Sequence, residues 1–340
     1  MNTATSILGD SNTVTTEGGY LNWARNVVGD NTTVRVLGGY ANSARNFFGD
    51  NVALTVQAGN GNTVRNIFGI DNEVTVQAGF GNFARSLFGD ANTVTVQGGT
   101  NNNARNLLGN ANTVTTQFGY SNLATNLAGN GNTVTSTGGF FNGARNIVGN
   151  GNVLSVGSLG SNLNLGLNLF GSNNQLNNSN QLTGGPGNLN VVINGGGSDN
   201  DISTAGPGNL NWAANVIGNT NTVAAGPGPL AAAWTVFRNG LTVTKTDFGI
   251  AINGFRIGGQ SAPSGQSNRT KTVDPAGTTG IINKTSKATG KPARTTTGSN
   301  KKTSKAPGKP ARTTTGSNKK TSKANDKPAG TTTGSNKDKS

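Results

Sequence analysis

Residues 81–100 read GNFARSLFGD and then ANTVTVQGGT, and this pair of unlike decapeptides sets the pattern of the N-terminal part of the chain. In residues 1–160, counted in blocks of ten, the second position is Asn in 14 of 16 blocks, the fourth is Ala, Val or Leu in all 16, and the ninth is Gly in 15. The stretch LNWARNVVGDNTTV at 21–34 returns as LNWAANVIGNTNTV at 210–223. The sequence is therefore a tandem array with a twenty-residue unit, which drifts after residue 160 but survives.

The repeat unit favours β-structure. Runs such as TVTV alternate in the manner of strands, and a Gly in nearly every block of ten disfavours a helix. Two strands of five or six residues, each followed by a turn, account for one unit. This predicts an all-β fold, a β-solenoid of about eleven coils over residues 1–228, in which equivalent positions stack at about 4.8 Å.

Alternation also predicts which side chains face the interior. Positions two, four, six and eight of each block are expected to point inward. The inward Asn side chains are expected to form amide ladders from coil to coil, and the small Ala, Val and Gly residues imply two closely spaced sheets. The inward residues expected in two representative blocks are Asn22, Ala24, Asn26 and Val28, and Asn92, Val94, Val96 and Gly98.

Two further regions follow the array. Residues 229–258 are the most apolar and aromatic part of the chain, and Asn239-Gly240 between two alternating runs predicts a β-hairpin that caps the solenoid. Residues 259–340 are rich in Lys, Thr and Pro, repeat every 18 residues from 284 to 337, and are expected to be disordered. No comparable cap precedes the first coil, so either the true start lies upstream or another chain stacks there.

The composition excludes much enzyme chemistry. The chain has no Cys and no His, which rules out thiolate nucleophiles, Ser-His-Asp triads and zinc sites of the usual kind. We expect no enzyme activity, no cofactor and no metal site. The acidic residues Asp30, Asp50, Asp71 and Asp90 fall at expected turns, where they are better explained as turn residues than as calcium ligands.

The net charge of +14 arises entirely in the tail. Residues 1–268 contain ten basic and ten acidic residues, whereas residues 269–340 contain seventeen basic and three acidic residues. Such a segment is expected to bind polyanions in a salt-sensitive way, with a solubilising linker as the alternative interpretation. The candidate tail residues are Lys284, Lys287, Lys291, Arg294, Lys301, Lys302, Lys305, Lys309, Arg312, Lys319, Lys320, Lys323 and Lys327.

The solenoid itself is predicted to carry a second basic feature. An Arg at the fifth position of alternate blocks predicts a column of guanidinium groups on one outer face, interrupted by Thr125, which could bind a polyanion. The alternative is a solvated face on which Asp30, Asp50 and Asp90 neutralise the charge. The residues of this column are Arg25, Arg45, Arg65, Arg85, Arg105 and Arg145.

The opposite face is predicted to carry pairs of Thr, such as Thr93 with Thr95 and Thr113 with Thr115. These pairs are similar to the Thr-X-Thr arrays of ice-binding solenoids. Arg35, Ala53 and Glu73 interrupt the array. We therefore interpret the Thr residues as a consequence of β-propensity.

The Asn-Gly decapeptides with their GNGN turns resemble the Asn/Gly-rich repeat regions of mycobacterial surface and secreted proteins, notably the major polymorphic tandem repeat members of the PPE family. The SKATGKPAR segments of the tail resemble the Lys/Ala/Pro-rich tails of heparin-binding adhesins and histone-like proteins. The helical module that begins PPE proteins has no counterpart here. The resemblance implies a cell-surface or secreted location, although no standard signal peptide and no membrane-spanning run is present.

Together these observations predict a non-enzymatic structural or adhesive protein that attaches to a polyanionic glycan or another cell-envelope polymer through the tail, assisted by the Arg residues of the solenoid. Self-association through the solenoid ends is a further expectation. One alternative is a nucleic-acid-associated protein whose tail binds phosphates. Another is a glycan-active β-helix enzyme, which requires clustered carboxylates on one face; the acidic residues of this chain are scattered.

Overall fold

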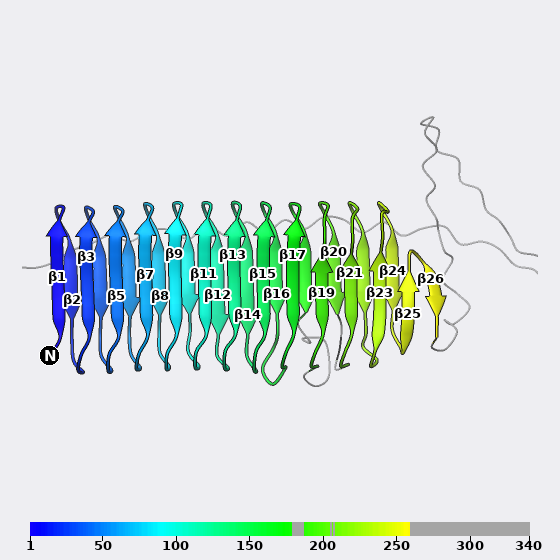
Figure 1. Ribbon diagram of the computed structural model, residues 1–340, viewed down its shortest axis with the longest axis horizontal. Helices are drawn as coiled ribbons and strands as arrows, with labels where there is room; N and C mark the ends of the chain where they lie inside the picture. Colours follow the sequence, from blue (N-terminus) through cyan, green and yellow to red (C-terminus); the bar gives the residue numbers. More distant parts are fainter. Residues whose placement is uncertain (179–186, 205, 207, 259–340) are drawn as a thin grey trace, which may run out of the picture. The chain divides into compact units, whose positions relative to one another are not determined.

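The computed structural model describes residues 1–178, 187–204, 206 and 208–258, and this part of the chain is a β-solenoid without a helix. Alternate strands build two sheets, here called sheet A and sheet B (Figure 1). The 14 strands of sheet A are β1 (Thr3–Leu8), β3 (Trp23–Val28), β5 (Ser43–Phe48), β7 (Thr63–Phe68), β9 (Phe83–Phe88), β11 (Asn103–Leu108), β13 (Leu123–Ala128), β15 (Gly143–Val148), β17 (Leu165–Phe170), β19 (Val191–Asn194), β21 (Trp212–Asn215), β23 (Ala231–Thr235), β25 (Gly249–Ile252) and β26 (Phe255–Ile257).

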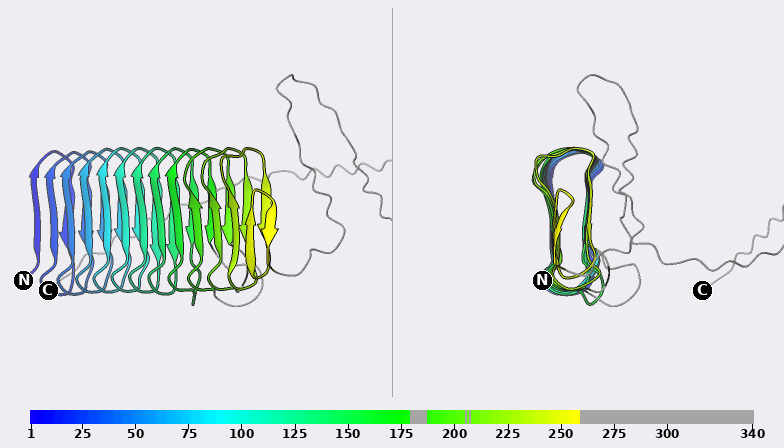
Figure 2. Two further views of the ribbon diagram at one scale, coloured as in Figure 1. Left: turned by 45° about the vertical axis from the view of Figure 1, so that its right-hand side comes forward. Right: turned by 90° about the vertical axis from the view of Figure 1, so that its right-hand side faces the viewer.

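Sheet B lies opposite sheet A, and the turns close both edges of the solenoid (Figure 2). Its 12 strands are β2 (Thr13–Thr16), β4 (Thr33–Val36), β6 (Ala53–Val56), β8 (Glu73–Val76), β10 (Thr93–Val96), β12 (Thr113–Gln117), β14 (Thr133–Thr137), β16 (Val153–Val156), β18 (Gln175–Asn178), β20 (Asp201–Thr204), β22 (Thr222–Ala225) and β24 (Thr242–Lys245).

The twenty-residue coil predicted from the repeat is confirmed. Apart from β25 and β26, neighbouring strands within each sheet are parallel, and in the regular part of the array a residue pairs with the residue twenty positions later, as Ala24 does with Ala44 and Val94 with Val114. Strands β1 to β22 form the eleven coils expected over residues 1–228. A twelfth coil, β23 with β24, extends the solenoid beyond that limit.

The cap differs from the prediction. Asn239-Gly240 does not turn a hairpin, because β23 before it belongs to sheet A and β24 after it belongs to sheet B. The antiparallel hairpin is instead formed by β25 and β26, which pair through Ile250 and Ile257. This hairpin closes the C-terminal end of sheet A. Residues 259–340, for which we predicted disorder, lie outside the described residues.

The interior is narrow and confirms the alternation at positions two, four and six. Asn22, Ala24 and Asn26 are at most 2% exposed. The prediction that position eight points inward is wrong for the first decapeptide of each coil, because Val28 is only half-buried and its equivalent Phe48 is 42% exposed. The reason lies in the turn: the Asn26 side chain donates to the carbonyl oxygen of Gly29 at 3.3 Å and ends the interior at position six.

The Gly at position nine permits the coils to approach one another. Gly39 has a φ of +79°, and a Cβ there would collide with the carbonyl oxygen of Gly59 in the next coil. The Asn42 side-chain amide donates to that same oxygen at 2.6 Å. Gly is therefore required at this position both for its backbone conformation and for the space.

Asn ladders connect the coils, as predicted. In one ladder the backbone N–H of Asn42 donates to Asn22 Oδ1 at 3.0 Å, and Asn62 repeats this contact with Asn42 at 2.9 Å. In a second ladder the Asn46 amide donates to Asn26 Oδ1 at 2.8 Å. These buried amides satisfy each other and the turn backbone, so the polar interior is tolerated.

The columns stay aligned where the sequence period changes. Arg145 pairs with Leu167 after 22 residues, Leu167 with Ile193 after 26, and Ile193 with Ala214 after 21. Because the strands keep their register, the extra residues lie in the turns. One position of the repeat therefore occupies one column on the surface along the whole solenoid.

Candidate functional site: the outer face of sheet A

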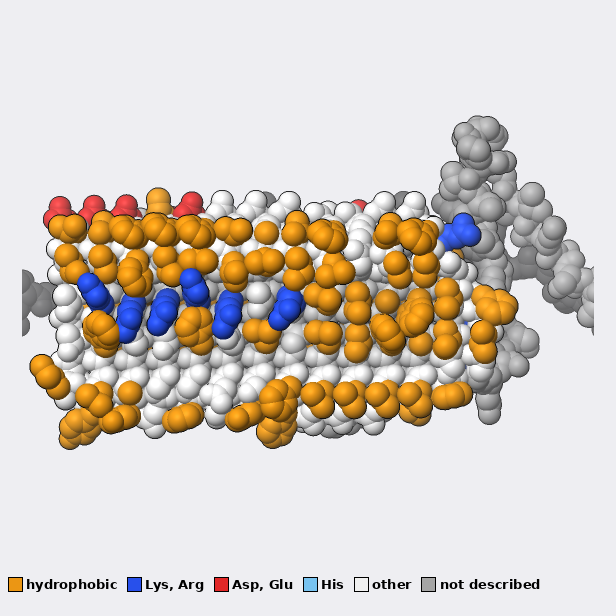
Figure 3. Space-filling model, viewed as in Figure 1, with side chains coloured by type: hydrophobic (Ala, Val, Ile, Leu, Met, Phe, Trp, Pro, Cys, Tyr) orange, Lys and Arg blue, Asp and Glu red, His pale blue; other side chains and the backbone are white. Residues whose placement is uncertain are grey.

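The six Arg residues predicted from the repeat form one column on sheet A, here called the arginine column. Arg25 pairs with Arg45, Arg45 with Arg65, and Arg65 with Arg85, each in strict register. Each Arg faces outward because its two neighbours in the strand, such as Ala24 and Asn26, are buried. Figure 3 shows these residues as a blue row across the face, with a gap at Thr125.

The spacing places the positive charges close together. Adjacent strands lie about 4.8 Å apart, so the column presents about one cationic group per 4.8 Å. Desolvation by burial, followed by the charges of Arg65 and Arg25, lowers the pKa of the Arg45 guanidinium. Desolvation, with Arg65 and Arg105, lowers the pKa of Arg85 in the same way. An anion placed along the column would relieve this repulsion.

Within the described residues no acidic side chain forms an ion pair with the column, which does not support the alternative in which Asp30, Asp50 and Asp90 neutralise it. Asp30 Oδ1 accepts the backbone N–H of Asp10 at 2.7 Å, and Asp50 Oδ1 accepts that of Asp30 at 2.8 Å. These carboxylates lie at the turns, along the upper edge of the face in Figure 3. Within the described residues the ion pair found is Arg35 with Glu17 on sheet B, at 4.0 Å.

Neighbouring side chains hold part of the column in place. The Arg45 guanidinium lies 3.8 Å from the centre of the Trp23 ring, and its Nε donates to Ser43 Oγ at 3.1 Å. Arg105 Nε donates to Asn103 Oδ1 at 2.7 Å. These contacts fix the stems of the side chains and their Nε groups, and leave the terminal nitrogens, which suit carboxylate, sulfate or phosphate oxygens, directed to the surface.

Apolar side chains border the column. Phe48, Phe68 and Phe88 stack along one side with ring centroids 4.9 and 5.1 Å apart and planes nearly parallel. Phe83 lies within the face, 5.9 Å from the Arg65 guanidinium and 5.3 Å from that of Arg105. Sheet A strands contain no Asp or Glu, so the strands of this face carry no acidic side chain beside the arginine column.

The sequence prediction missed the continuation of this column. Beyond Arg145 the same register position holds Leu167, Ile193, Ala214, Trp234 and Ile252. The signal was present at Ala214, which replaces the Arg of the earlier copy of its repeat. The inserted residues between coils concealed that Leu167 and Ile193 are further members.

The Thr pairs on sheet B are in register, but the array is short. Thr93, Thr113 and Thr133 form one column over three consecutive coils, and Glu73 and Val153 interrupt it on either side. In the second column Arg35 stands between Thr15 and Thr55. The interruptions predicted from the sequence are therefore present on this face.

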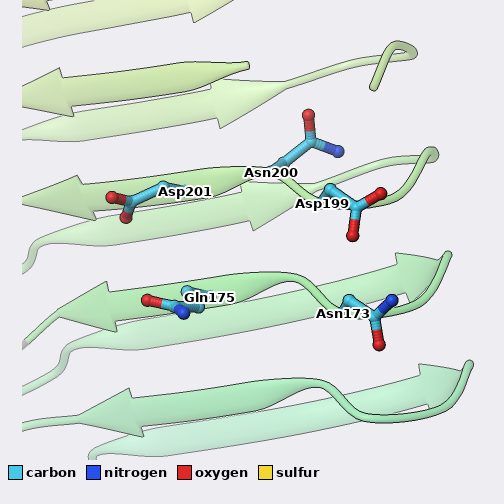
Figure 4. A pocket seen from close by; sticks show the side chains of 5 residues that line it. All are labelled: Asn173, Gln175, Asp199, Asn200 and Asp201. Carbon is cyan, nitrogen blue, oxygen red and sulfur yellow. The ribbon is translucent and has the colours of Figure 1, made fainter. Parts of the chain in front are cut away.

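A shallow polar pocket lies on sheet B near the start of β18 and β20 (Figure 4). It is lined by Asn173, Gln175, Asp199, Asn200 and Asp201. The Asn200 amide points into the interior of the solenoid, where it donates to Asn174 Oδ1 at 3.0 Å. Within the described residues, no three or more Asp, Glu, His or Cys side chains are grouped to hold a metal ion.

Three of the four turn Asp residues accept backbone N–H groups. Besides Asp30 and Asp50, Asp90 Oδ1 accepts the N–H of Ile70 at 2.8 Å. At other turns Asn takes this role, as Asn110 does for Asp90. This interchange supports the interpretation of these residues as turn residues. The basic residues of the tail, from Lys284 to Lys327, lie outside the described residues.

No protein-family model, no curated protein sequence and no solved structure matches this chain. In the described part of the chain, no helix has the length and apolarity required to cross a membrane. The fold defines the protein as a β-solenoid, and the arginine column on sheet A is its candidate binding site.

Proposed function

We propose that the protein is a non-enzymatic scaffold whose arginine column binds a linear polyanion, with a polyanionic glycan as the preferred class. The single observation that carries the proposal is the register of the six Arg residues, which stack on sheet A without an acidic partner within the described residues. A rigid row of like charges repels itself, and a linear anion is the ligand that relieves the repulsion along the whole row.

The chemistry of the side chains supports an extended anion. Guanidinium groups bind carboxylate, sulfate and phosphate oxygens through paired N–H donors. The backbone holds these groups at regular spacing. A chain molecule therefore forms several contacts, while only one polymer loses conformational freedom. The bordering Phe48, Phe68 and Phe88 offer apolar surface to the uncharged parts of such a polymer.

A glycan is preferred to a nucleic acid on one structural ground. Single-stranded nucleic acids are held without sequence preference by aromatic rings on which bases stack. The ring of Trp23 is already covered by Arg45 at 3.8 Å, and Phe83 lies between Arg65 and Arg105. The rings of Phe48, Phe68 and Phe88 stack on one another at 4.9 and 5.1 Å, which leaves no room for a base between them. Nucleic acid remains the second candidate, and it is tested beside the glycan.

The tail and the location complete the proposal. The seventeen basic residues of 269–340 would add salt-sensitive, nonspecific attraction for the same polymer. Attachment to a cell-envelope polymer at the cell surface, or after secretion, is the setting in which a long anionic glycan is available to a repeat protein. The resemblance to mycobacterial repeat proteins and heparin-binding adhesins is the basis of this part of the proposal.

The test is elution from heparin and from single-stranded DNA columns with increasing salt. We expect the triple variant Arg45→Thr, Arg65→Thr, Arg85→Thr to elute from heparin at clearly lower salt than the wild type. The matched control is Arg35→Thr, which removes one Arg from sheet B and should shift elution only slightly. A variant without residues 269–340 measures the contribution of the tail.

Three results would oppose the proposal. If the triple variant elutes with the wild type while tail deletion abolishes retention, the tail alone binds. If wild-type retention is stronger on DNA than on heparin, nucleic acid is the better ligand class. Fractionation of cells that finds the native protein with the nucleoid would contradict the surface location.

A further inference from the structure

The second half of the sheet A face is apolar and has no polar side chain on its outer strand positions. We call it the apolar half and define it by the outward residues of β17, β19, β21, β23 and β25. Figure 3 shows it as the orange region beyond the blue row. Its members are Leu165, Leu167, Val191, Ile193, Trp212, Ala214, Ala232, Trp234, Ile250 and Ile252.

Several of these side chains are well exposed. Trp212 is 43% exposed, and Leu165 and Ile250 are each 39% exposed. Five strands at about 4.8 Å by four to six residues at about 3.3 Å give a flat area of about 320–480 Å². The largest apolar patch on a typical monomer is about 300–600 Å² and is often functional, so this patch lies in the range that marks an interaction site.

The chain's own tail is a poor partner for this surface. Residues 259–340 contain seventeen basic residues, and Val273, Ile281 and Ile282 are the only large aliphatic residues among them. Burying Lys and Arg against apolar side chains would cost desolvation energy without any acidic residue to pair with. A polar, cationic segment therefore does not match the apolar half.

A second copy of the chain does match it. Two such patches placed face to face would bury about 640–960 Å² in total, which is the size of a weak, reversible interface. Both surfaces are flat sheets with the same strand spacing. The two Trp side chains, Trp212 and Trp234, pack edge to face at 4.9 Å and supply the large aromatic groups that dominate such interfaces.

Charge determines the orientation. If two copies faced each other in parallel along their whole length, the two arginine columns would lie against each other, and like charges would repel. If they overlapped completely in antiparallel fashion, each column would be buried against Leu167 and Ile193 of the other copy. Only the overlap of the two apolar halves, with the coil axes in opposite directions, leaves both columns in water.

We propose that the protein forms a twofold dimer through the apolar half of sheet A, with antiparallel coil axes and with β21, the central strand of the five, next to the twofold axis. The arginine columns of the two copies then extend away from the interface at opposite ends. The dimer doubles the number of columns without changing either of them.

The test is analytical ultracentrifugation of the full chain over a range of concentrations. The wild type is expected to pass from monomer to dimer in the micromolar range. Ile193→Lys, one strand from the centre of the apolar half, is expected to raise the dissociation constant at least 100-fold. The matched control Ser203→Lys, which lies on the outer face of sheet B, should dimerise like the wild type. Circular dichroism checks that all variants remain folded.

Orientation is tested with single cysteines, because the natural chain has none. A short bismaleimide should cross-link Ala232→Cys, which lies one strand from the proposed axis, and should leave Arg25→Cys monomeric. Cross-linking of Arg25→Cys, a wild type that stays monomeric at 100 μM, or equal dimerisation by Ile193→Lys would each overturn the proposal. So would monomers that bind lipid vesicles through Ile193, because the patch would then serve a membrane surface.

Discussion

The two halves of the sheet A face share one backbone and differ most in one column. From Arg25 to Arg145 the outward fifth position carries charge, and from Leu167 to Ile252 it carries only apolar side chains. The buried Asn ladder is the same beneath both halves. At the boundary, for example, the Asn168 amide donates to Asn146 Oδ1 at 2.7 Å. The interior positions therefore specify the solenoid, and the outward positions are free to specify what it binds.

The most damaging change is expected in the turns that both halves need. Gly109 has a φ of +119°, and a Cβ there would collide with the carbonyl oxygen of Gly129. Gly109→Val should lower the free energy of unfolding by about 4 kcal/mol or more, because a backbone contact cannot yield. Urea unfolding measures the loss.

The control for this variant is a Gly whose surroundings are open. Gly131 also has a positive φ, of +63°, but nothing lies within 4 Å of its expected Cβ. Ala111 occupies the equivalent turn position at a φ of +54°. Gly131→Ala should cost only about 1 kcal/mol. Equal losses in the two variants would show that close packing of the coils is not the reason for the Gly at position nine.

A smaller loss is expected when an Asn ladder is cut. The Asn126 amide donates to Asn106 Oδ1 at 2.8 Å, and its oxygen accepts from Asn146 at 2.7 Å. Asn126→Ala should cost about 3 kcal/mol, because at least two buried polar groups lose their partners. Replacement of Asn103, which is only partly buried and lies outside the ladder, by Ala is the comparison, and a similar loss there would contradict the importance of the ladder.

One substitution in the same ladder is expected to increase stability. Ser86 stands where most other coils have Asn, and its buried hydroxyl has no hydrogen-bond partner. Ser86→Asn should raise the free energy of unfolding by about 1 kcal/mol, because it reconnects the ladder between Asn66 and Asn106. Unchanged or reduced stability in the same urea experiment would show that the ladder tolerates interruption at no cost.

The smallest effect is expected from a substitution at the gap in the arginine column. Thr125 lies in register between Arg105 and Arg145. Thr125→Arg should steepen the plot of log affinity for heparin against log salt concentration by about 0.7–0.9, because one more charge is neutralised. Its stability should fall by less than about 1 kcal/mol through repulsion. An unchanged slope would mean that the column does not contact the polymer.

The repeat predicted most of the fold because its constraints are local. A strict spacing of Asn, small apolar residues and Gly determines the coil length, the buried positions and the ladders. The exposed position eight was not predictable from alternation, since the Asn26 side chain ends the interior before the strand itself ends. Asn239-Gly240 has hairpin composition, but the flanking strands pair with the previous coil instead of with each other.

The functional face was predicted only in part. The six Arg residues could be aligned from the sequence, because their spacing is constant at twenty or its multiple. The role of Asp30 and Asp50 could not be predicted, since their distance from the column depends on the position of the turn. The apolar half was hidden because register across loops of different length is decided by strand pairing and not by residue count.

The central claim is that stacking in register makes the arginine column a linear site, and the dependence of affinity on ligand length tests it most directly. From Arg25 to Arg145 there are six coil intervals, or about 29 Å. Titration of the full chain with heparin-type oligosaccharides of increasing length should show affinity rising until the ligand spans about 29 Å and then levelling off, and the triple Arg variant should lose this break. A rise that continues smoothly with length, equal in wild type and triple variant, would contradict the account.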